Sequence, residues 1–328
     1  MGGGLGEGAR PGRGEGVAQV GASGHEQCLL RAQFVAPGAH GVGITVGHGG
    51  TVAGRAPARG GTARRCAIVN GPRPTPEGAR VTTRPPTEDR PRITSFVHHR
   101  ARLTEGQQRA WDRSWPVLGR DVDDVVDGSV AYDPPAWFGR TAPLVLEIGS
   151  GMGESTAALA AAAPEYDHLA VEVFEPGLAQ LLMRVEELGL GNLALLRGDA
   201  VELLRARVPE GSLSAVRIFF PDPWPKRKHR KRRLVQPEIA ALVASRLAPG
   251  GTLHLATDWD DYATQMRAVC DGEHSLVNTA ADEPGGWFPR PDWRPVTKFE
   301  QRAHLGGRAV HDLLYRRGSA GRTSDHAS

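Results

Sequence analysis

Short apolar runs alternate with helical patterns between Leu144 and Cys270, and this alternation limits the chain to few folds. The apolar runs span residues 144–148, 168–173, 193–197, 215–220 and 251–257. Apolar residues recur at helical spacing over about 154–163, 176–188, 200–207, 236–247 and 260–270. Strands that are apolar at nearly every position are typical of a parallel sheet that is covered by helices on both faces. We therefore expect an α/β domain with a mostly parallel sheet.

The flanking sequence predicts further elements. Thr104 and Gln107 have the spacing of a capping box, which predicts a helix through about Val117. The segments 294–303 and 310–316 are interpreted as a closing hairpin at one edge, which brings the expected sheet to seven strands.

Residues 1–88 differ in texture from the rest of the chain. Of the 42 glycines, 21 lie in residues 1–80, and no hydrophobic period is sustained there. Such a segment buries too little apolar surface to offset its ordering entropy, so we predict a disordered extension rich in Gly, Pro and Arg. A further hypothesis is that translation begins at Val81 rather than Met1. The folded domain is then expected at 89–317, with a flexible tail at 318–328.

Composition sets limits on the environment. No run of eighteen apolar residues occurs, so no membrane span is predicted. Cys28 and Cys66 lie in the extension, which leaves Cys270 alone in the expected domain as a small packed side chain. One cysteine gives no disulfide framework, which fits a reducing cytoplasm. The histidines lack metal-ligand spacing, so no metal site is predicted.

A basic run from Lys226 to Arg233 is the strongest functional signal. It carries seven permanent positive charges, whereas the whole chain has a net charge of only +3, so the basicity is local. The run lies between an expected strand and an expected helix, which favours nucleic-acid contact over a solvated loop. Asp222 and Trp224 directly precede it, and they would add a polar group and an aromatic face to the same site.

A glycine-rich turn follows the first expected strand. Gly149, Gly151 and Gly153 alternate with other residues, as in loops that bring backbone N–H groups against a ligand. The dinucleotide fingerprint would require glycine at position 154, where the chain has Glu154, so a nicotinamide cofactor is disfavoured. Carboxylates at Glu147 and Glu154 suit a ligand with positive charge, such as S-adenosylmethionine.

Two more acids end the next strands. Glu172 ends the second strand, where a carboxylate can accept hydrogen bonds from both ribose hydroxyls. Asp199 follows the third strand, where it can meet the adenine amino group; capping of the next helix is an equally good interpretation of Asp199 alone. Together these acids predict a ribose and adenine site at the carboxyl edge of the sheet.

Three motifs carry a resemblance to a known family. They are Phe220-Pro221-Asp222-Pro223-Trp224-Pro225-Lys226, then Ala256-Thr257-Asp258, then Thr297-Lys298-Phe299-Glu300. Residues 144–257 resemble class I S-adenosylmethionine-dependent methyltransferases, which have a Rossmann-like fold. With the motifs included, about residues 90–317 resemble the bacterial tRNA (guanine-N7-)-methyltransferase family.

The resemblance implies transfer of a methyl group from S-adenosylmethionine to N7 of the variable-loop guanine, position 46, in tRNA. It assigns Asp222 as the active-site acid, although a local cap in a Pro-Asp-Pro turn is the alternative. The expected cofactor residues are Glu147, Gly149, Gly151, Gly153, Glu172, Asp199 and Asp222. The expected substrate residues are Lys226, Asp258, Thr297, Lys298, Phe299 and Glu300. The expected RNA contacts are Lys228, His229, Arg230, Lys231, Arg232 and Arg233.

Chemistry supports roles for some of these residues and leaves others open. Guanine N7 has a free lone pair, so alignment matters more than a strong base. Trp224 would stack on the guanine or form only a hydrophobic lid. The alternating run 298–300 predicts that Phe299 faces the core and that Lys298 reaches a phosphate.

Other function classes compete with this reading. One is a non-catalytic RNA-binding protein that has kept the fold, and another is a small-molecule methyltransferase with a basic surface loop. We expect tRNA as the partner, no membrane, no obligate protein partner, and a monomer or homodimer in the cytoplasm.

Overall fold

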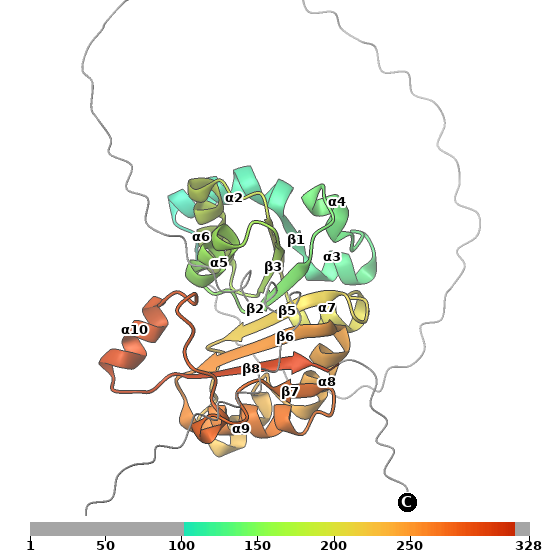
Figure 1. Ribbon diagram of the computed structural model, residues 1–328. Helices are drawn as coiled ribbons and strands as arrows, with labels where there is room; N and C mark the ends of the chain where they lie inside the picture. Colours follow the sequence, from blue (N-terminus) through green and yellow to red (C-terminus); the bar gives the residue numbers. More distant parts are fainter. Residues whose placement is uncertain (1–101, 319–328) are drawn as a thin grey trace, which may run out of the picture. The chain divides into compact units, whose positions relative to one another are not determined.

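A computed structural model describes residues 102–318 of the chain (Figure 1). The predicted extension 1–88, the Val81 start and all but the first residue of the predicted tail lie outside the described residues. In the described part, no helix combines the length and the apolar character needed to cross a membrane.

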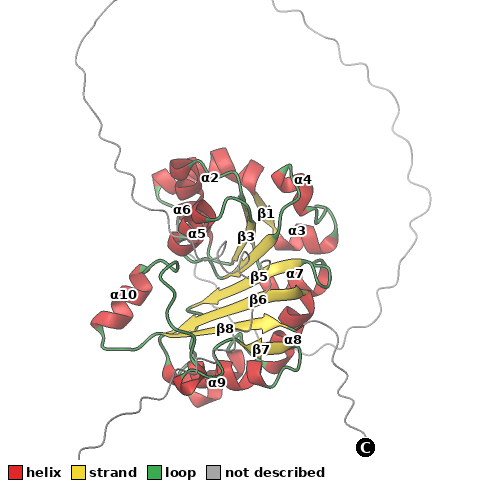
Figure 2. Cartoon of the chain, viewed as in Figure 1, coloured by secondary structure: helices red, strands yellow, loops and turns green. Residues whose placement is uncertain are grey.

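One sheet organises the described residues, as Figure 2 shows in yellow. Its order is β1-β4-β3-β2-β5-β6-β8-β7, and pairing is parallel from β1 through β6 and antiparallel between β8 and each of its neighbours. The strands are β1 (Gly119–Asp121), β2 (Leu144–Ile148), β3 (Asp167–Glu172), β4 (Leu193–Arg197), β5 (Leu213–Phe219), β6 (Leu247–Thr257), β7 (Leu276–Asn278) and β8 (His311–Arg317).

Helices connect the strands, and the predicted capping box opens the first of them. Thr104 N–H donates to Gln107 Oε1 at 3.0 Å, and Gln107 N–H donates to Thr104 Oγ1 at 3.3 Å. The α-helices are α2 (Glu105–Leu118), α3 (Val122–Asp127), α4 (Pro134–Phe138), α5 (Glu154–Ala162), α6 (Glu175–Leu188), α7 (Ala200–Ala206), α8 (Pro237–Arg246), α9 (Asp260–Asp271) and α10 (Lys298–Leu305). Two 3₁₀-helices, η1 (Arg227–Arg232) and η2 (Pro284–Gly286), complete the set.

The core lies on both faces of the sheet, as the apolar runs predict. In β4, Leu193 and Leu195 pack against α2, α5 and α6, whereas Ala194 and Leu196 belong to the larger cluster that includes α3, α7, α8 and α9. Successive side chains of a strand point to opposite faces, so an uninterrupted apolar run fills both layers. The α/β class, the five predicted strands and their helices are confirmed, with bounds that shift by a few residues.

Only the second half of the predicted closing hairpin is confirmed. Its second segment forms β8, but its first segment contains no strand, because Thr297 caps α10 by accepting from Glu300 N–H. The Thr-x-x-Glu spacing is a helix-start signature that the alternating pattern hid. The partner of β8 at the edge is β7 instead, and with β1 the sheet has eight strands rather than seven.

Candidate active site

A cavity of about 640 Å³ lies at the carboxyl ends of the central strands. Its walls come from the loop after β2, the ends of β3, β4 and β5, helix α6 and the first turns of α10. The arrowheads of β5 and β6 point toward the end of the sheet at which α10 lies (Figure 2). Of the predicted site residues, the cavity brings together Glu147, Gly149, Gly151, Gly153, Glu172, Asp199, Asp222, Thr297, Lys298 and Phe299.

The glycine loop has the backbone conformation that its sequence requires. Gly149, Gly151 and Gly153 have φ of 81°, 55° and 72°, values that disfavour side chains with a Cβ. At Gly153 a Cβ would lie 2.6 Å from Leu181 of α6. Gly177, which sequence reasoning missed, lets α6 approach the same loop, because a Cβ there would lie 2.3 Å from the carbonyl oxygen of Gly151.

Glu172 holds the loop as well as lining the cavity. Its Oε2 accepts from Gly151 N–H at 2.7 Å, and its Oε1 accepts from the N–H groups of Val173 and Phe174 at 2.7 and 2.9 Å. An ionised carboxylate has about four acceptor positions, so one remains for a ligand hydroxyl. Asp199 also has two roles, because it lines the cavity and caps α7 by accepting from Val201 N–H at 2.8 Å.

Glu147 is a buried acid whose pKa is raised above its ordinary value. It is 5% exposed, it lines the cavity, and its Oε2 has no hydrogen-bond partner. Burial raises the pKa of Glu147 to about 7, although the charge of Arg217, its register partner on β5, opposes the shift. Burial likewise lowers the pKa of Arg217. A cationic group in the cavity would give Glu147 Oε2 a hydrogen-bond partner.

The turn that carries Asp222 is strained. Phe220 and Trp224 have φ of 51° and 41°, the left-handed region that non-glycine residues rarely adopt. Phe220 N–H donates to Ala256 O at 2.8 Å, which ties the start of the turn to β6. Asp222 is exposed on this turn and lines the cavity. Strain of this kind is concentrated at functional sites.

The basic run forms η1 next to this turn, and its charges are not equivalent. Arg233 is 2% exposed: it donates to Pro223 O at 2.8 Å and to Gln265 Oε1 at 2.7 Å, and it pairs with Asp261. This placement differs from the predicted RNA contact, because the buried guanidinium cannot reach a phosphate.

The other cations of the run stay at the surface. Arg230 pairs with Asp261 at 3.0 Å, and the Arg232 guanidinium lies 4.2 Å from the centre of the Trp224 ring. The side chains of Lys226, Arg227, Lys228 and Lys231 are exposed. His229 lies edge-on to Trp224, with the ring centres 5.9 Å apart. Because Arg232 already lies over the Trp224 indole, this arrangement is compatible with Trp224 as a lid over the site.

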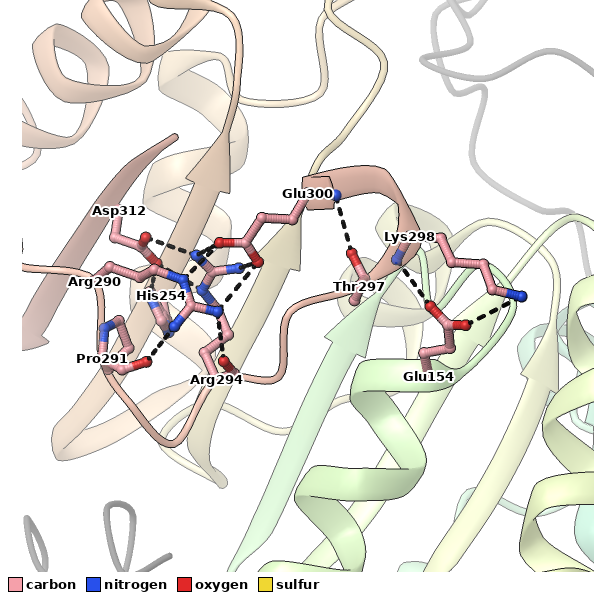
Figure 3. Close-up of polar contacts among 9 residues, drawn as sticks. All are labelled: Glu154, His254, Arg290, Pro291, Arg294, Thr297, Lys298, Glu300 and Asp312. Atoms are coloured by element: carbon pink, nitrogen blue, oxygen red, sulfur yellow. Dashed lines mark hydrogen bonds and ion pairs between the residues drawn. The ribbon is translucent and has the colours of Figure 1, made fainter. Parts of the chain in front are cut away.

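The first turn of α10 closes one side of the cavity. Lys298 N–H donates to Glu154 Oε2 at 3.1 Å, and Lys298 Nζ lies 3.7 Å from Glu154 Oε1 (Figure 3). Phe299 is 58% exposed and lines the cavity, so the prediction that it faces the core is wrong. The core side of α10 is taken by Glu300 and Ala303, which follow a helical rather than an alternating period.

Three predicted substrate residues do not line the cavity. Lys226 is exposed at the start of η1. Asp258 accepts from Arg308 Nε at 2.8 Å. Glu300 is 0% exposed and is bound by Arg290 and Arg294.

The structure adds residues to the site that sequence reasoning missed. Gln180 and Arg184 of α6, Arg302 of α10 and Leu234 line the cavity. Arg302 follows Lys298 by one helical turn, so recognising 298–305 as a helix would have found it. Arg184 donates to Met152 O at 3.2 Å and lies 3.5 Å from Glu154, and no motif signals that position.

Comparisons with known proteins find relatives of this chain. Residues 141–313 match the family described as "Putative methyltransferase". A tRNA (guanine-N(7)-)-methyltransferase of Methylococcus capsulatus is 51% identical over 226 residues, which are 69% of this chain and 94% of the relative. A protein of the same name from Nocardia farcinica is 48% identical over 240 residues, or 71% of this chain and 87% of the relative.

Solved structures give weaker matches. The crystal structure of the 16S rRNA methyltransferase KamB is 15% identical, with a TM-score of 0.39, and the match covers 55% of this chain and 90% of that one. The sequence relatives, of which nearly the full length is covered, decide the assignment. The chain belongs to the tRNA (guanine-N(7)-)-methyltransferase family.

Proposed function

We propose that this protein transfers a methyl group from S-adenosylmethionine to N7 of the variable-loop guanine, position 46, in cytoplasmic tRNA. The observation that carries the proposal is the convergence of four acids, Glu147, Glu172, Asp199 and Asp222, on one cavity beside a basic turn. The names of the family's members support the reaction and its substrate.

The residues of the cavity fit S-adenosylmethionine. The molecule carries a sulfonium and an ammonium group and no phosphate, and Glu147 Oε2 is a buried acceptor without a partner in the cavity wall. No atom comes within 4 Å of a Cβ built at Gly149 or Gly151, so the loop backbone faces open space there. Glu172 and Asp199 would hold the ribose and the adenine, as the strand-end positions predict.

When bound, S-adenosylmethionine supplies an electrophilic methyl group. The protein's own task is then to align guanine N7 with that group, and positioning of this kind lowers barriers by up to ~7–11 kcal/mol. N7 carries a free lone pair, so no side chain has to remove a proton before attack. Asp222 favours the positive charge that develops on the base, because a fixed carboxylate stabilises the transition state more than the neutral ground state.

RNA binding is assigned to the exposed cations of the basic turn. Lys228, Arg230 and Lys231 are exposed and would contact backbone phosphates, the half-buried Arg232 lies over Trp224, and Arg233 holds the turn in place. Such contacts carry no sequence information. Selection of one guanine then depends on the shape of the folded tRNA.

The test is methyl transfer to tRNA. Purified protein is incubated with labelled S-adenosylmethionine and unmodified tRNA transcripts, and aniline cleavage locates N7-methylguanine. We expect a cut in the variable loop with the wild type and none with Asp222→Ala. Asp222→Asn keeps the size of the side chain and removes its charge, so it separates charge stabilisation from loop geometry.

Other outcomes support other functions. If methyl label enters the tRNA but aniline does not cleave it, the methylated atom is not guanine N7. Activity on a small molecule that survives removal of the charges in η1 supports a small-molecule methyltransferase. Tight tRNA binding without uptake of S-adenosylmethionine supports a non-catalytic RNA-binding protein.

A further inference from the structure

Arg294 lies at the centre of a buried charge cluster that no motif predicts (Figure 3). Its Nε and Nη2 donate to the two carboxylate oxygens of Asp312 in β8 at 3.0 and 2.9 Å. Its Nη1 and Nη2 also donate to the two oxygens of Glu300 in α10 at 2.8 and 3.1 Å. The planar guanidinium therefore joins a strand of the sheet to a helix of the cavity wall by two bidentate contacts.

The cluster is balanced in charge and almost closed to water. Arg294 is 1% exposed, Asp312 is 1% exposed, and Glu300 also accepts from Arg290 Nε at 2.6 Å. His254 Nε2 lies 2.8 Å from Asp312 Oδ1, and burial lowers the pKa of His254 and so favours the neutral imidazole. Two arginines thus face two carboxylates. Breaking such a buried cluster at one member is costly, so its geometry is rigid.

The guanidinium of Arg294 also lies near the other functional segment. The centre of its guanidinium lies 5.8 Å from the ring centre of Phe219 and 5.7 Å from that of Phe220. Phe219 ends β5, and Phe220 is the strained residue at the start of the turn that leads to Asp222. One side chain therefore lies over the two rings that lead into the Asp222 turn and also binds α10 through Glu300.

The far end of the first turn of α10 is fixed as well. Glu154, at the start of α5, binds the backbone N–H of Lys298, and α5 follows the glycine loop directly. Thr297 precedes this contact and Phe299 lies between it and Glu300, and Thr297, Lys298 and Phe299 all line the cavity. The spacing of the cavity wall from Asp222 is thus set by Arg294 on one side and by Glu154 on the other.

We propose that Arg294 is a positioning residue for methyl transfer, which locks the Asp222 turn and the first turn of α10 at a fixed separation. The inference rests on the proposed function, because it concerns the same site. Arg294 itself does not line the cavity. Glu300 then acts through Arg294 rather than by contact with the substrate.

The test compares Arg294→Lys with Arg290→Lys. Both variants keep the charge near Glu300, but among the described residues Arg290 has no hydrogen bond or ion pair with Asp312 and no cation–ring interaction with Phe219 or Phe220. For Arg294→Lys we expect kcat on tRNA to fall on the order of 100-fold, as for a misplacement of about 1 Å, with KM for tRNA and for S-adenosylmethionine changed by less than about threefold. Arg290→Lys is expected to keep kcat within about threefold.

Hydrogen–deuterium exchange supplies a readout that does not depend on activity. In Arg294→Lys, amides of both 219–224 and 298–305 should exchange faster, whereas in Arg290→Lys only those of 298–305 should. If Arg294→Lys does not fold, Glu300→Gln tests the same link from the α10 side and should also lower kcat with KM preserved.

Each outcome is decisive. Equal reduction of kcat in the two variants, or faster exchange confined to α10 in Arg294→Lys, reduces Arg294 to a stabilising ion pair and overturns the inference. If the wild type is active and Arg294→Lys is fully active too, the inference is overturned but the proposed function stands. A wild type that transfers no methyl group to tRNA overturns the proposed function and this inference with it.

Discussion

Side chains of the same type have different roles in this protein because their burial differs. Arg233 and Lys231 belong to one basic run, yet the first is buried among Pro223, Gln265 and Asp261 and the second is exposed. Charge count alone would treat the two residues as equivalent.

We therefore predict opposite effects of two alanine substitutions in this run. Arg233→Ala should lower the free energy of unfolding by at least about 2 kcal/mol, because it removes a buried side chain together with its hydrogen bonds to Pro223, Gln265 and Asp261. Lys231→Ala should change stability by less than about 0.5 kcal/mol and should weaken tRNA binding instead. Urea denaturation and filter binding on both variants provide the check. Equal free energies of unfolding in the two variants would mean that the contacts of Arg233 do not stabilise the fold.

Glu147 gives a prediction for pH. Its pKa is raised from 4.5 to about 7 by burial, so between these values the folded protein binds a proton that the unfolded chain has released. Stability should therefore fall as pH rises from about 4.5 to 7, by on the order of 2 kcal/mol. In Glu147→Gln this part of the slope should disappear. Urea denaturation of the ligand-free protein at several pH values measures it, and an unchanged slope in the variant would contradict the assignment.

At the scale of elements, α6 approaches the glycine loop closely at Gly177. Gly177→Ala should weaken S-adenosylmethionine binding at least about tenfold, because the new methyl group must displace the Gly151 carbonyl or the helix. Gly106→Ala is the matched control near the start of α2, where a Cβ would meet nothing closer than 3.8 Å. Isothermal titration calorimetry distinguishes the two variants. Comparable affinities would show that the loop adjusts at little cost.

How well each element can be predicted depends on the length of its signal. The five central strands are buried along nearly their whole apolar runs, and residues of β3 and β4 belong to the core clusters on both faces, so these runs are visible without any structure. Strands β1 and β7 have three residues each, which is too short for any period to appear. The start of α10 is predicted as a strand because Lys298, Phe299 and Glu300 alternate between polar and apolar. The capping signal of Thr297 and Glu300, which marks a helix start, receives less weight in that prediction.

The site is predictable where the chemistry follows the strand ends. Glu147, Glu172, Asp199 and Asp222 each follow or end a strand, so topology alone brings them to one edge. The burial of Arg233 and Glu300 is not predictable, because it depends on partners such as Asp261 and Arg294 that lie 28 and 6 residues away in the chain. Arg184 lines the cavity only because α6 packs beside the glycine loop, and its own neighbours carry no motif.

At the scale of the whole molecule, the chain has a net charge of only +3, so the proposed RNA affinity is expected to come from the basic run. A variant in which Lys228, Arg230 and Lys231 are replaced by glutamine should bind tRNA more weakly. The slope of log K against log salt should flatten by roughly 0.7–0.9 for each phosphate that the variant no longer neutralises. Glutamine at Arg102, Arg109 and Arg205 removes the same charge away from the cavity and should leave the slope unchanged. Equal flattening by both triple variants would assign binding to net charge instead.

The described sheet ends at both sides in a strand of three residues, β1 at one edge and β7 at the other. A long, flat edge strand offers a row of unpaired N–H and C=O groups to another chain, and short edges are one way in which natural proteins blunt that hazard. The long apolar strands of this sheet are all interior, with a neighbour on each side. The same brevity that hides β1 and β7 from sequence analysis thus protects the folded protein from edge-to-edge aggregation.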